Sequence, residues 1–193
     1  MPKVETFNRD LVIEQVTNVF HDKGFNATSM QDIVDATGLN RSSIYNSFEN
    51  KHNLFLECLK TYKSRSNNHL SDKLSTASNS LDAIALIFDV YIEEIIKNVH
   101  DKGCLIVNCA SEMANHDVSI TDFLFKNQSD MLTFLENLVS KGQKEQLINT
   151  NKSSKEYALY LYSSIQGFRM TGILISDKPE LESIKNTIIQ TLI

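Results

Sequence analysis

Residues 28–51 read TSMQDIVDATGLNRSSIYNSFENK and contain the signals for two short helices separated by a glycine turn. Thr28 followed by Gln31 three residues later makes a capping-box pattern, which predicts a helix that begins near Thr28. Gly38 tolerates the left-handed backbone that often ends a helix. This stretch therefore predicts a helix, a tight turn and a second helix.

The second of these helices is predicted to pack by one face only. Asn40 is a good N-cap, and Ile44 and Phe48 are four residues apart, so that both face inward. The opposite face consists of Arg41, Ser42, Ser43, Asn46 and Ser47. Between Ala36 and Phe48 the only charged side chain is Arg41. A face that is rich in donors and free of acids is what a helix needs in order to read DNA.

The side chains of this face have the chemistry of base and phosphate contacts. Arg41 can bond a guanine edge in bidentate fashion, and Ser42 and Ser43 can bond base edges or phosphate. Tyr45 would suit a phosphate, and Lys51 adds positive charge at a helix N-terminus, where anions are favoured. The alternative is a solvated surface helix in an ordinary bundle, because glycine turns between helices are common.

The stretch from Val12 to Lys51 resembles, without a gap, the N-terminal domain of the TetR family of bacterial transcriptional repressors. The matching residues are Val12, Ile13, Val16, Phe20, Lys23, Gly24, Phe25, Thr28, Ser29, Met30, Asp32, Ile33, Val34, Gly38, Leu39, Ile44, Tyr45, Phe48, Lys51 and Leu54. Beyond Tyr62 the resemblance rests on length and helix pattern. It implies an all-α fold, with a helix-turn-helix head in residues 1–50 and a ligand-binding, dimerising helical body in residues 51–193.

The resemblance also implies roles for individual residues of the head. Residues that grip phosphates in such repressors align with Thr28, Ser29, Tyr45 and Lys51. Residues placed to reach bases align with Gln31, Arg41, Ser42, Ser43 and Asn46, and the capping Asn40 completes the predicted DNA-binding set. The position of Asn46 is often aromatic or His in relatives, so the stacking or sugar contact made there does not carry over to this chain, and Asn46 could instead bond an adenine edge.

Composition indicates a helical protein with an acidic balance. The 193 residues include 41% hydrophobic residues, no Trp, two Pro and six Gly, and no strand-like alternation is found. The net charge is −5, and residues 1–51 hold five basic and seven acidic side chains. The basic footprint that usually marks a DNA-binding domain is therefore missing. We expect few phosphate contacts per subunit and a moderate salt dependence of binding.

The chain has no signal for secretion or for a membrane. Its N-terminus is polar, and no apolar run approaches the roughly 18 residues that a transmembrane helix needs. Three cysteines without a disulfide-like framework suggest reduced thiols. We therefore expect a cytoplasmic protein with no membrane partner.

Helical periodicity continues along the rest of the chain. The predicted helices or apolar stripes cover residues 8–23, 54–62, 81–99, a short helix from 104, then 123–140, 153–175 and 181–192, with a frayed or turn region at 64–80 and a loop at 149–152. The last stripe is more than one protomer is expected to cover completely, which predicts a homodimer formed by the last two helices. Such a dimer would set two reading helices about 34–36 Å apart on a palindromic operator. The alternative is a fully intramolecular core.

A short segment after Gly103 predicts part of a ligand pocket. Helical spacing places Cys104, Val107, Asn108, Ser111 and Glu112 on one face. The predicted lining of a mostly apolar pocket for a small apolar or aromatic effector is Phe88, Tyr91, Cys104, Val107, Asn108, Phe134, Tyr162, Gln166 and Met170. Cys104 is either a sensor of oxidants or electrophiles or a small buried hydrophobe.

Other chemistries have weaker support in the sequence. His100 and Cys104 are four residues apart, but Gly103 interrupts the helix and no second pair completes a metal site, so no metal or cofactor is expected. No glycine-rich phosphate loop, nucleophile elbow or HExxH motif is found, which argues against an enzyme. The favoured function is a DNA-binding repressor whose effector shifts the helix of residues 54–62. The alternatives are a helical dimeric adaptor without DNA readout and a small all-α enzyme with dispersed catalytic residues.

Overall fold

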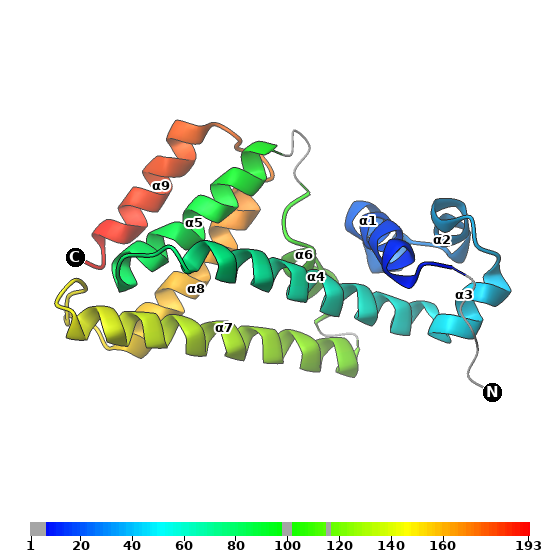
Figure 1. The fold of residues 1–193 in the computed structure, drawn as a ribbon, viewed down its shortest axis with the longest axis horizontal. Coiled ribbons are helices and arrows are strands. Elements are labelled where there is room, and N and C mark those ends of the chain that lie inside the picture. The colour runs from blue at the N-terminus through cyan, green and yellow to red at the C-terminus, as the bar shows by residue number, and fades with distance from the viewer. Residues whose placement is uncertain (1–6, 98–101, 115–116) are drawn as a thin grey trace.

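The computed structural model describes residues 7–97, 102–114 and 117–193, which form helices and no strand (Figure 1). The helices are α1 (Arg9–Ala27), α2 (Met30–Thr37), α3 (Arg41–Phe48), α4 (Lys51–Leu74), α5 (Ser80–Lys97), α6 (Leu105–Met113), α7 (Val118–Lys144), α8 (Ser154–Thr171) and α9 (Lys178–Gln190). This confirms the predicted all-α class. None of the helices in these ranges is both long and apolar enough to cross a bilayer.

The head consists of α1, α2 and α3, as predicted. Asn8 caps α1, where its side chain accepts a hydrogen bond from the backbone N–H of Leu11. Val16 and Phe20 of α1 are buried in the head. At Gly24 the backbone leaves the helical conformation with a φ of 78°, so the last residues of α1 turn toward α2.

The cap of α2 differs from the prediction by one residue. Ser29 caps this helix: its side chain accepts from the N–H of Asp32, and the Asp32 carboxylate accepts from the N–H of Ser29. Thr28 is buried, and its hydroxyl donates to the carbonyl of Gly24 over 2.6 Å. The predicted Thr28–Gln31 capping box is therefore wrong, because the Thr28 hydroxyl is used by the preceding turn.

The long helix α4 joins the head to the body (Figure 1). Its 24 residues correspond to about 36 Å. The predicted frayed region at residues 64–80 is helical up to Leu74, since Leu70 is buried against the body, and the turn follows at residues 75–79. One rigid element thus reaches from the reading head into the middle of the body.

The buried side chains form two cores, and the first is not confined to the head. It combines residues of α1, α2, α3 and the first turns of α4 with Leu105, Cys109 and Met113 of α6 and Ile120 of α7. The second core lies among the remaining parts of α4, α5, α7, α8 and α9. The domain boundary after residue 50 stays a prediction, and the first core extends across it.

α7 is longer than its stripe predicted, whereas α8 ends at Thr171, before the predicted residue 175. α7 begins before the predicted Phe123, because the side chain of Asp117 accepts from the N–H of Ile120 and caps the helix. It also continues through Gly142, where an added Cβ would lie 2.5 Å from Cδ1 of Ile148, so that a side chain there would displace Ile148. α5 is described as far as Lys97, and its predicted continuation to residue 99 lies outside the described residues.

The last stripe of apolar residues is covered within the protomer. Leu181, Ile188 and Leu192 are buried in the body core, where α9 packs against α5. The expectation that one protomer could not cover this stripe is therefore wrong. α8 is different, because its apolar side chains Leu159 and Met170 are exposed to solvent.

Candidate nucleic-acid interface

The reading helix α3 is built as predicted. Asn40 caps it by accepting from the N–H of Ser43 over 2.9 Å, and Ile44 and Phe48 are buried beneath it. The exposed residues are Arg41, Ser42, Tyr45 and Asn46, whereas Ser43 is half-buried. Four polar side chains of α3, none of them acidic, therefore face outward together.

Arg41 is held in place by a chain of hydrogen bonds that reaches α2. Its Nη2 donates to Oε1 of Gln31 over 3.1 Å, and Nε2 of Gln31 donates to Oδ1 of Asp35 over 2.7 Å. The structure thus brings together two of the residues predicted to reach bases. Because the guanidinium is positioned before DNA arrives, less of its conformational freedom is lost on binding.

The predicted phosphate contacts differ in their accessibility. Ser29 and Tyr45 are exposed at the surface of the head. The hydroxyl of Thr28 is buried and donates to the carbonyl of Gly24, and the phosphate contact implied for this residue stays a prediction.

Lys51 has a structural role that its charge alone did not reveal. Its ammonium donates to the carbonyls of Phe25 (2.8 Å) and Thr28 (2.7 Å), and it lies 4.3 Å from the centre of the Phe25 ring. An ammonium has three donors, so one remains for a phosphate. Lys51 therefore ties the end of α1 to the start of α4.

Arg9 is a functional neighbour of α3 that the sequence analysis missed. Its guanidinium lies 4.2 Å from the centre of the Phe48 ring and pairs with Glu57 of α4 over 2.7 Å. Helical periodicity offers no signal for it, because a charged residue in the first turn of a helix is usually solvated. The arginine braces the end of α3 against α4.

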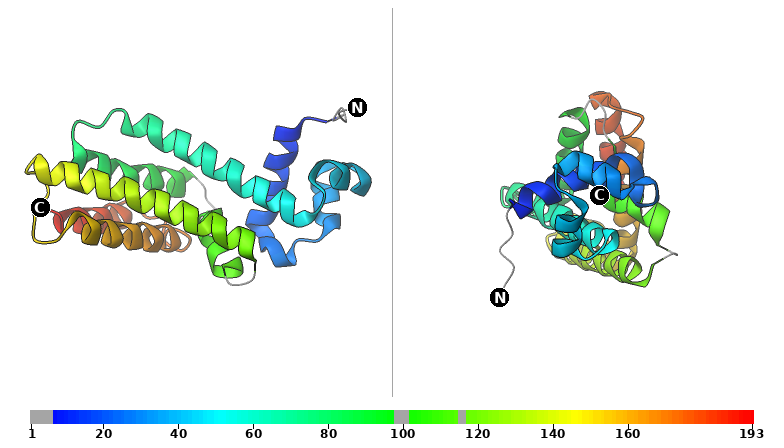
Figure 2. Two further views of the ribbon diagram at one scale, coloured as in Figure 1. Left: turned by 90° about the horizontal axis from the view of Figure 1, so that it is seen from below. Right: turned by 90° about the vertical axis from the view of Figure 1, so that its right-hand side faces the viewer.

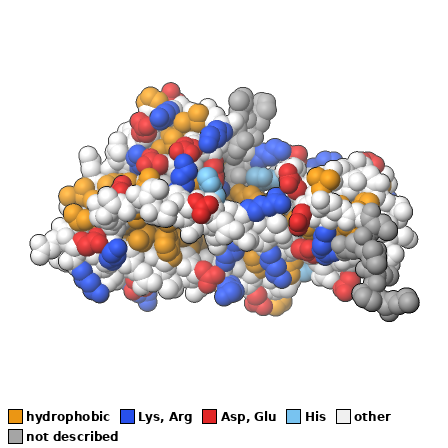
Figure 3. Space-filling view, viewed as in Figure 1, with side chains coloured by type: hydrophobic (Ala, Val, Ile, Leu, Met, Phe, Trp, Pro, Cys, Tyr) orange, Lys and Arg blue, Asp and Glu red, His pale blue; other side chains and the backbone are white. Residues whose placement is uncertain are grey.

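The surface of the head carries charges of both signs, as Figure 3 shows for one face. Lys23 pairs with Asp32 over 2.6 Å. Hydrogen bonds from Lys23 and Ser29 hold the pKa of the Asp32 carboxyl well below its usual range. This acid is thus ionised and matched by a cation, which limits its repulsion of DNA phosphates.

The predicted ligand residues divide among several cavities of the body. Tyr91, Cys104, Val107 and Gln166 line one small cavity of about 60 Å³. Val107 and Gln166 also line a 270 Å³ pocket between α6, α7 and α8, together with Tyr162. Phe134 belongs to a separate groove of 540 Å³ between α4 and α7. The predicted set therefore does not form a single pocket.

Three of the predicted ligand residues lie elsewhere. Phe88 is fully buried, and its ring packs edge-on against Phe168 at 5.4 Å. Met170 is exposed on the outer side of α8, and Asn108 donates to the carbonyl of Lys102 over 2.8 Å. These three residues line none of the cavities described here, because both sides of the helices concerned are apolar and the pattern does not tell a core face from a cavity face.

The cysteines are free thiols and all three are buried. Burial raises the pKa of Cys58 and of Cys109 to about 12 each. Cys104 stands at the N-cap position of α6 without a side-chain capping bond. The described ranges contain no group of three His, Cys, Asp or Glu that could hold a metal ion, and His100 lies outside those ranges.

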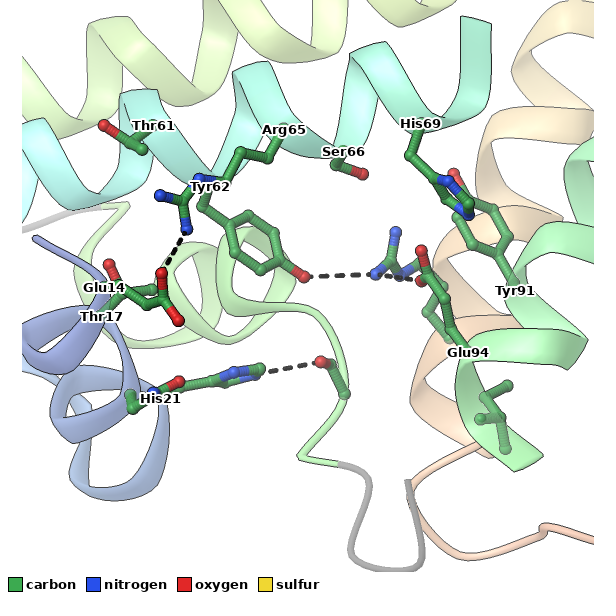
Figure 4. Close-up of a pocket in the computed structure, with 14 residues that line it drawn as sticks. Glu14, Thr17, His21, Thr61, Tyr62, Arg65, Ser66, His69, Tyr91 and Glu94 are labelled. Atoms are coloured by element: carbon green, nitrogen blue, oxygen red, sulfur yellow. Dashed lines mark hydrogen bonds and ion pairs between the residues drawn. The ribbon is translucent and has the colours of Figure 1, made fainter. Parts of the chain in front are cut away.

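The junction of head and body contains a cleft of about 490 Å³, which the sequence analysis did not predict (Figure 4). We call it the junction cleft, and its lining consists of Glu14, Thr17, Asn18, His21, Thr61, Tyr62, Arg65, Ser66, His69, Tyr91, Glu94, Ile95, Gly103 and Arg169. Polar residues from α1, α4, α5 and α8 meet there. No periodic pattern within one helix signals such a convergence.

Glu112 of α6 makes a second connection between body and head. Its carboxylate accepts from the backbone N–H groups of Phe25 (2.9 Å) and Asn26 (2.7 Å) at the end of α1. A side chain at Gly24 would approach this carboxylate to 2.8 Å, so glycine makes room for it. A displacement of α6 would thus act directly on the segment that leads into α2.

We expect Glu112→Gln to destabilise the protein by about 1–3 kcal/mol, because a neutral amide replaces a charged acceptor of two backbone hydrogen bonds. Urea unfolding followed by circular dichroism measures this difference. Glu136→Gln on α7 is the matched control, since no ion pair or hydrogen bond of its side chain is found in the described ranges. Equal effects of the two substitutions would contradict the role of Glu112.

Comparison with known proteins agrees with this architecture. The family description "Bacterial regulatory proteins, tetR family" matches residues 12–58, and "Tetracyclin repressor-like, C-terminal domain" matches residues 80–188. The HTH-type transcriptional regulator YezE of Bacillus subtilis is 26% identical over 184 residues, which cover 94% of either chain. The HTH-type transcriptional repressor ComR of Escherichia coli is 25% identical, over 89% of this chain and 81% of ComR.

Solved structures share the fold over nearly the whole chain. A TetR transcriptional regulator from Chloroflexus aurantiacus has a TM-score of 0.84 at 22% identity, covering 94% of this chain and 92% of that one. A cysteine mutant of the TetR family regulator CifR, complexed with 26-bp operator DNA, has a TM-score of 0.86 at 17% identity and covers 99% of this chain and 100% of CifR. The two family matches together span the head and the body, and the second alone covers more than half of the chain. This protein belongs to the TetR family of bacterial regulatory proteins.

Proposed function

We propose that this protein is a cytoplasmic repressor that binds a palindromic operator as a homodimer and leaves it when a small molecule enters the body. The observation that carries the proposal is the exposed, acid-free face of α3, on which Arg41 is already held by Gln31. The relative ComR, which is named as a repressor, supports the direction of regulation. The operator complex of CifR supports DNA as the partner.

The proposed dimer uses the exposed side of α8, with α9 beside it. Leu159, Ser163, Gly167 and Met170 follow one another at intervals of three or four residues and are all exposed. The space around Gly167 is open, because no atom lies within 4 Å of the position of an added Cβ. Two copies of α8 could therefore pack closely about a two-fold axis. In the left view of Figure 2, orange α8 lies on the side of the body away from α4.

The proposed effector is a small, mostly apolar or aromatic molecule that binds among α6, α7 and α8. Tyr162, Val107 and Gln166 line the 270 Å³ pocket there. An effector shifts the protein only if it prefers the conformation that does not bind DNA. Displacement of α6 would reach the head through Glu112, which provides a physical route for release.

Arg41→Ala is the substitution that tests DNA reading. On an operator obtained by random-sequence selection, we expect a loss of about 1–3 kcal/mol in binding free energy and relaxed preference at one base position. Binding to random DNA should change little. Fluorescence anisotropy with both DNAs measures the two affinities, and Lys126→Ala on exposed α7 serves as the control.

Lys51→Ala tests the predicted phosphate contact, which does not depend on the DNA sequence, and so complements Arg41→Ala. We expect it to weaken binding to all sequences alike, to flatten the salt dependence, and to destabilise the head, because its ammonium also holds two backbone carbonyls. Equal losses for Arg41→Ala and Lys51→Ala on random DNA would refute this division of roles. A protein that selects no sequence at all would favour the helical adaptor.

A further inference from the structure

We propose that the junction cleft binds a small organic carboxylate, with Arg169 of α8 as its anchor. The cleft has a volume of about 490 Å³, which is within the usual range of roughly 300–1,000 Å³ for small-molecule sites. It is distinct from the 270 Å³ pocket proposed for the apolar effector, because it opens between α1 and the body. In Figure 4, Tyr62 and Glu94 point toward the same guanidinium, that of Arg169, and the ring of His21 points to the carbonyl of Gly103.

The guanidinium of Arg169 is largely buried, and its contacts with Tyr62 and Glu94 are long. Its side chain is 12% exposed, its Nη2 donates to the Tyr62 hydroxyl over 3.4 Å, and the same atom lies 3.5 Å from a carboxylate oxygen of Glu94. The face of the guanidinium lies 4.4 Å from the centre of the Tyr91 ring. In the described part of the chain its hydrogen bond to Tyr62 and its ion pair with Glu94 both use Nη2, and Tyr91 is a further side-chain partner. A largely buried cation whose contacts are long gains from an added anion.

The charges around the cleft favour an anion over a cation. Glu14 pairs with Arg65 over 3.3 Å, and both of these side chains are more than half exposed, so water screens them. Glu94 faces Arg169. The least screened charge in the cleft is therefore the positive charge of Arg169, which would repel a cationic ligand and attract an anionic one.

The other walls of the cleft select an organic acid. The rings of Tyr62 and Tyr91 and the side chain of Ile95 line it together with Arg169. A guanidinium forms strong, charge-assisted hydrogen bonds with carboxylate oxygens. A small organic acid would thus accept hydrogen bonds from Arg169 with its carboxylate, and its ring or short chain would pack against the two tyrosines.

Calorimetric titration of the full-length protein with sodium benzoate tests the proposal, and benzamide serves as the neutral analogue of the same shape. We expect benzoate to bind at least about tenfold more tightly than benzamide. Arg169→Gln should abolish this preference. Arg65→Gln, which removes the other arginine of the same cleft, should leave benzoate affinity within about twofold. No DNA is present, so the result is separate from the repressor function proposed above.

The proposal is overturned if benzoate and benzamide bind equally, if Arg65→Gln and Arg169→Gln lose the same affinity, or if Arg169→Gln binds benzoate as the wild type does. Failure of both benzoate and hexanoate to bind at about 10 mM would overturn it as well. If Arg169→Gln does not fold, Arg169→Lys replaces it and should bind benzoate more weakly than the wild type. The comparison of benzoate with benzamide on the wild-type protein needs no variant.

Discussion

Met170→Glu is expected to convert the dimer into a monomer and to reduce operator affinity by about a hundredfold or more. Met170 is 45% exposed in the protomer, so its replacement should leave the fold of the protomer intact. In a contact between two copies of α8 the new carboxylate would be buried without a partner, at a cost of several kcal/mol. A monomer loses the gain in affinity that comes from linking two heads.

Sedimentation velocity and operator binding measure the two effects together. Val118→Glu on α7 is the matched control, since it introduces the same charge at an apolar residue that is 79% exposed. This control should remain a dimer and bind DNA normally. If Met170→Glu also remains a dimer with full operator affinity, the exposed side of α8 is not the interface.

Phe20→Ala is expected to lower the free energy of unfolding by about 3–5 kcal/mol, a large part of the roughly 5–15 kcal/mol that stabilises a typical domain. Phe20 is buried at the centre of the head, where its ring meets Phe55 of α4 edge-on at 4.7 Å and Phe25 at 6.1 Å. Alanine would leave a cavity between Phe25 and Phe55, because these rigid rings cannot move into the space. Equilibrium unfolding in urea measures the loss.

Phe125→Ala is the control for this stability measurement. Phe125 is 64% exposed on α7, so its truncation should change the free energy of unfolding by no more than about 0.5 kcal/mol. Equal effects of the two substitutions would contradict the packing of the head core. Because that core includes Leu105 and Cys109 of α6, we also expect the head to unfold together with α6.

The helix-turn-helix could be predicted because its determinants are local. The cap at Asn40 and the inward pair of Ile44 and Phe48 lie within nine residues, and the structure confirms them. The cap of α2 was misplaced by one residue because Thr28 and Ser29 both fit the pattern. Only the buried hydrogen bond from Thr28 to Gly24 distinguishes the two.

Partners that are distant in sequence could not be predicted. Periodicity reports that a stripe is buried but does not name what covers it, and so the stripe of α9 suggested a second protomer where α5 covers it. Glu112 meets the end of α1 across more than 80 residues, and Arg169 meets Tyr62 across more than 100. In the sequence, nothing distinguishes Glu112 and Arg169 from other charged residues, because their partners are brought close only by the fold.

The joint between Glu112 and the end of α1 depends on backbone atoms of the head. Its donors are the N–H groups of Phe25 and Asn26, which every residue except proline supplies. Substitutions of Phe25 or Asn26 by any residue except proline therefore keep both hydrogen bonds to Glu112, provided that Gly24 leaves room for the carboxylate. This joint therefore makes no demand on the side chains of the head, whereas the packing of Leu105, Cys109 and Met113 of α6 into the head core does.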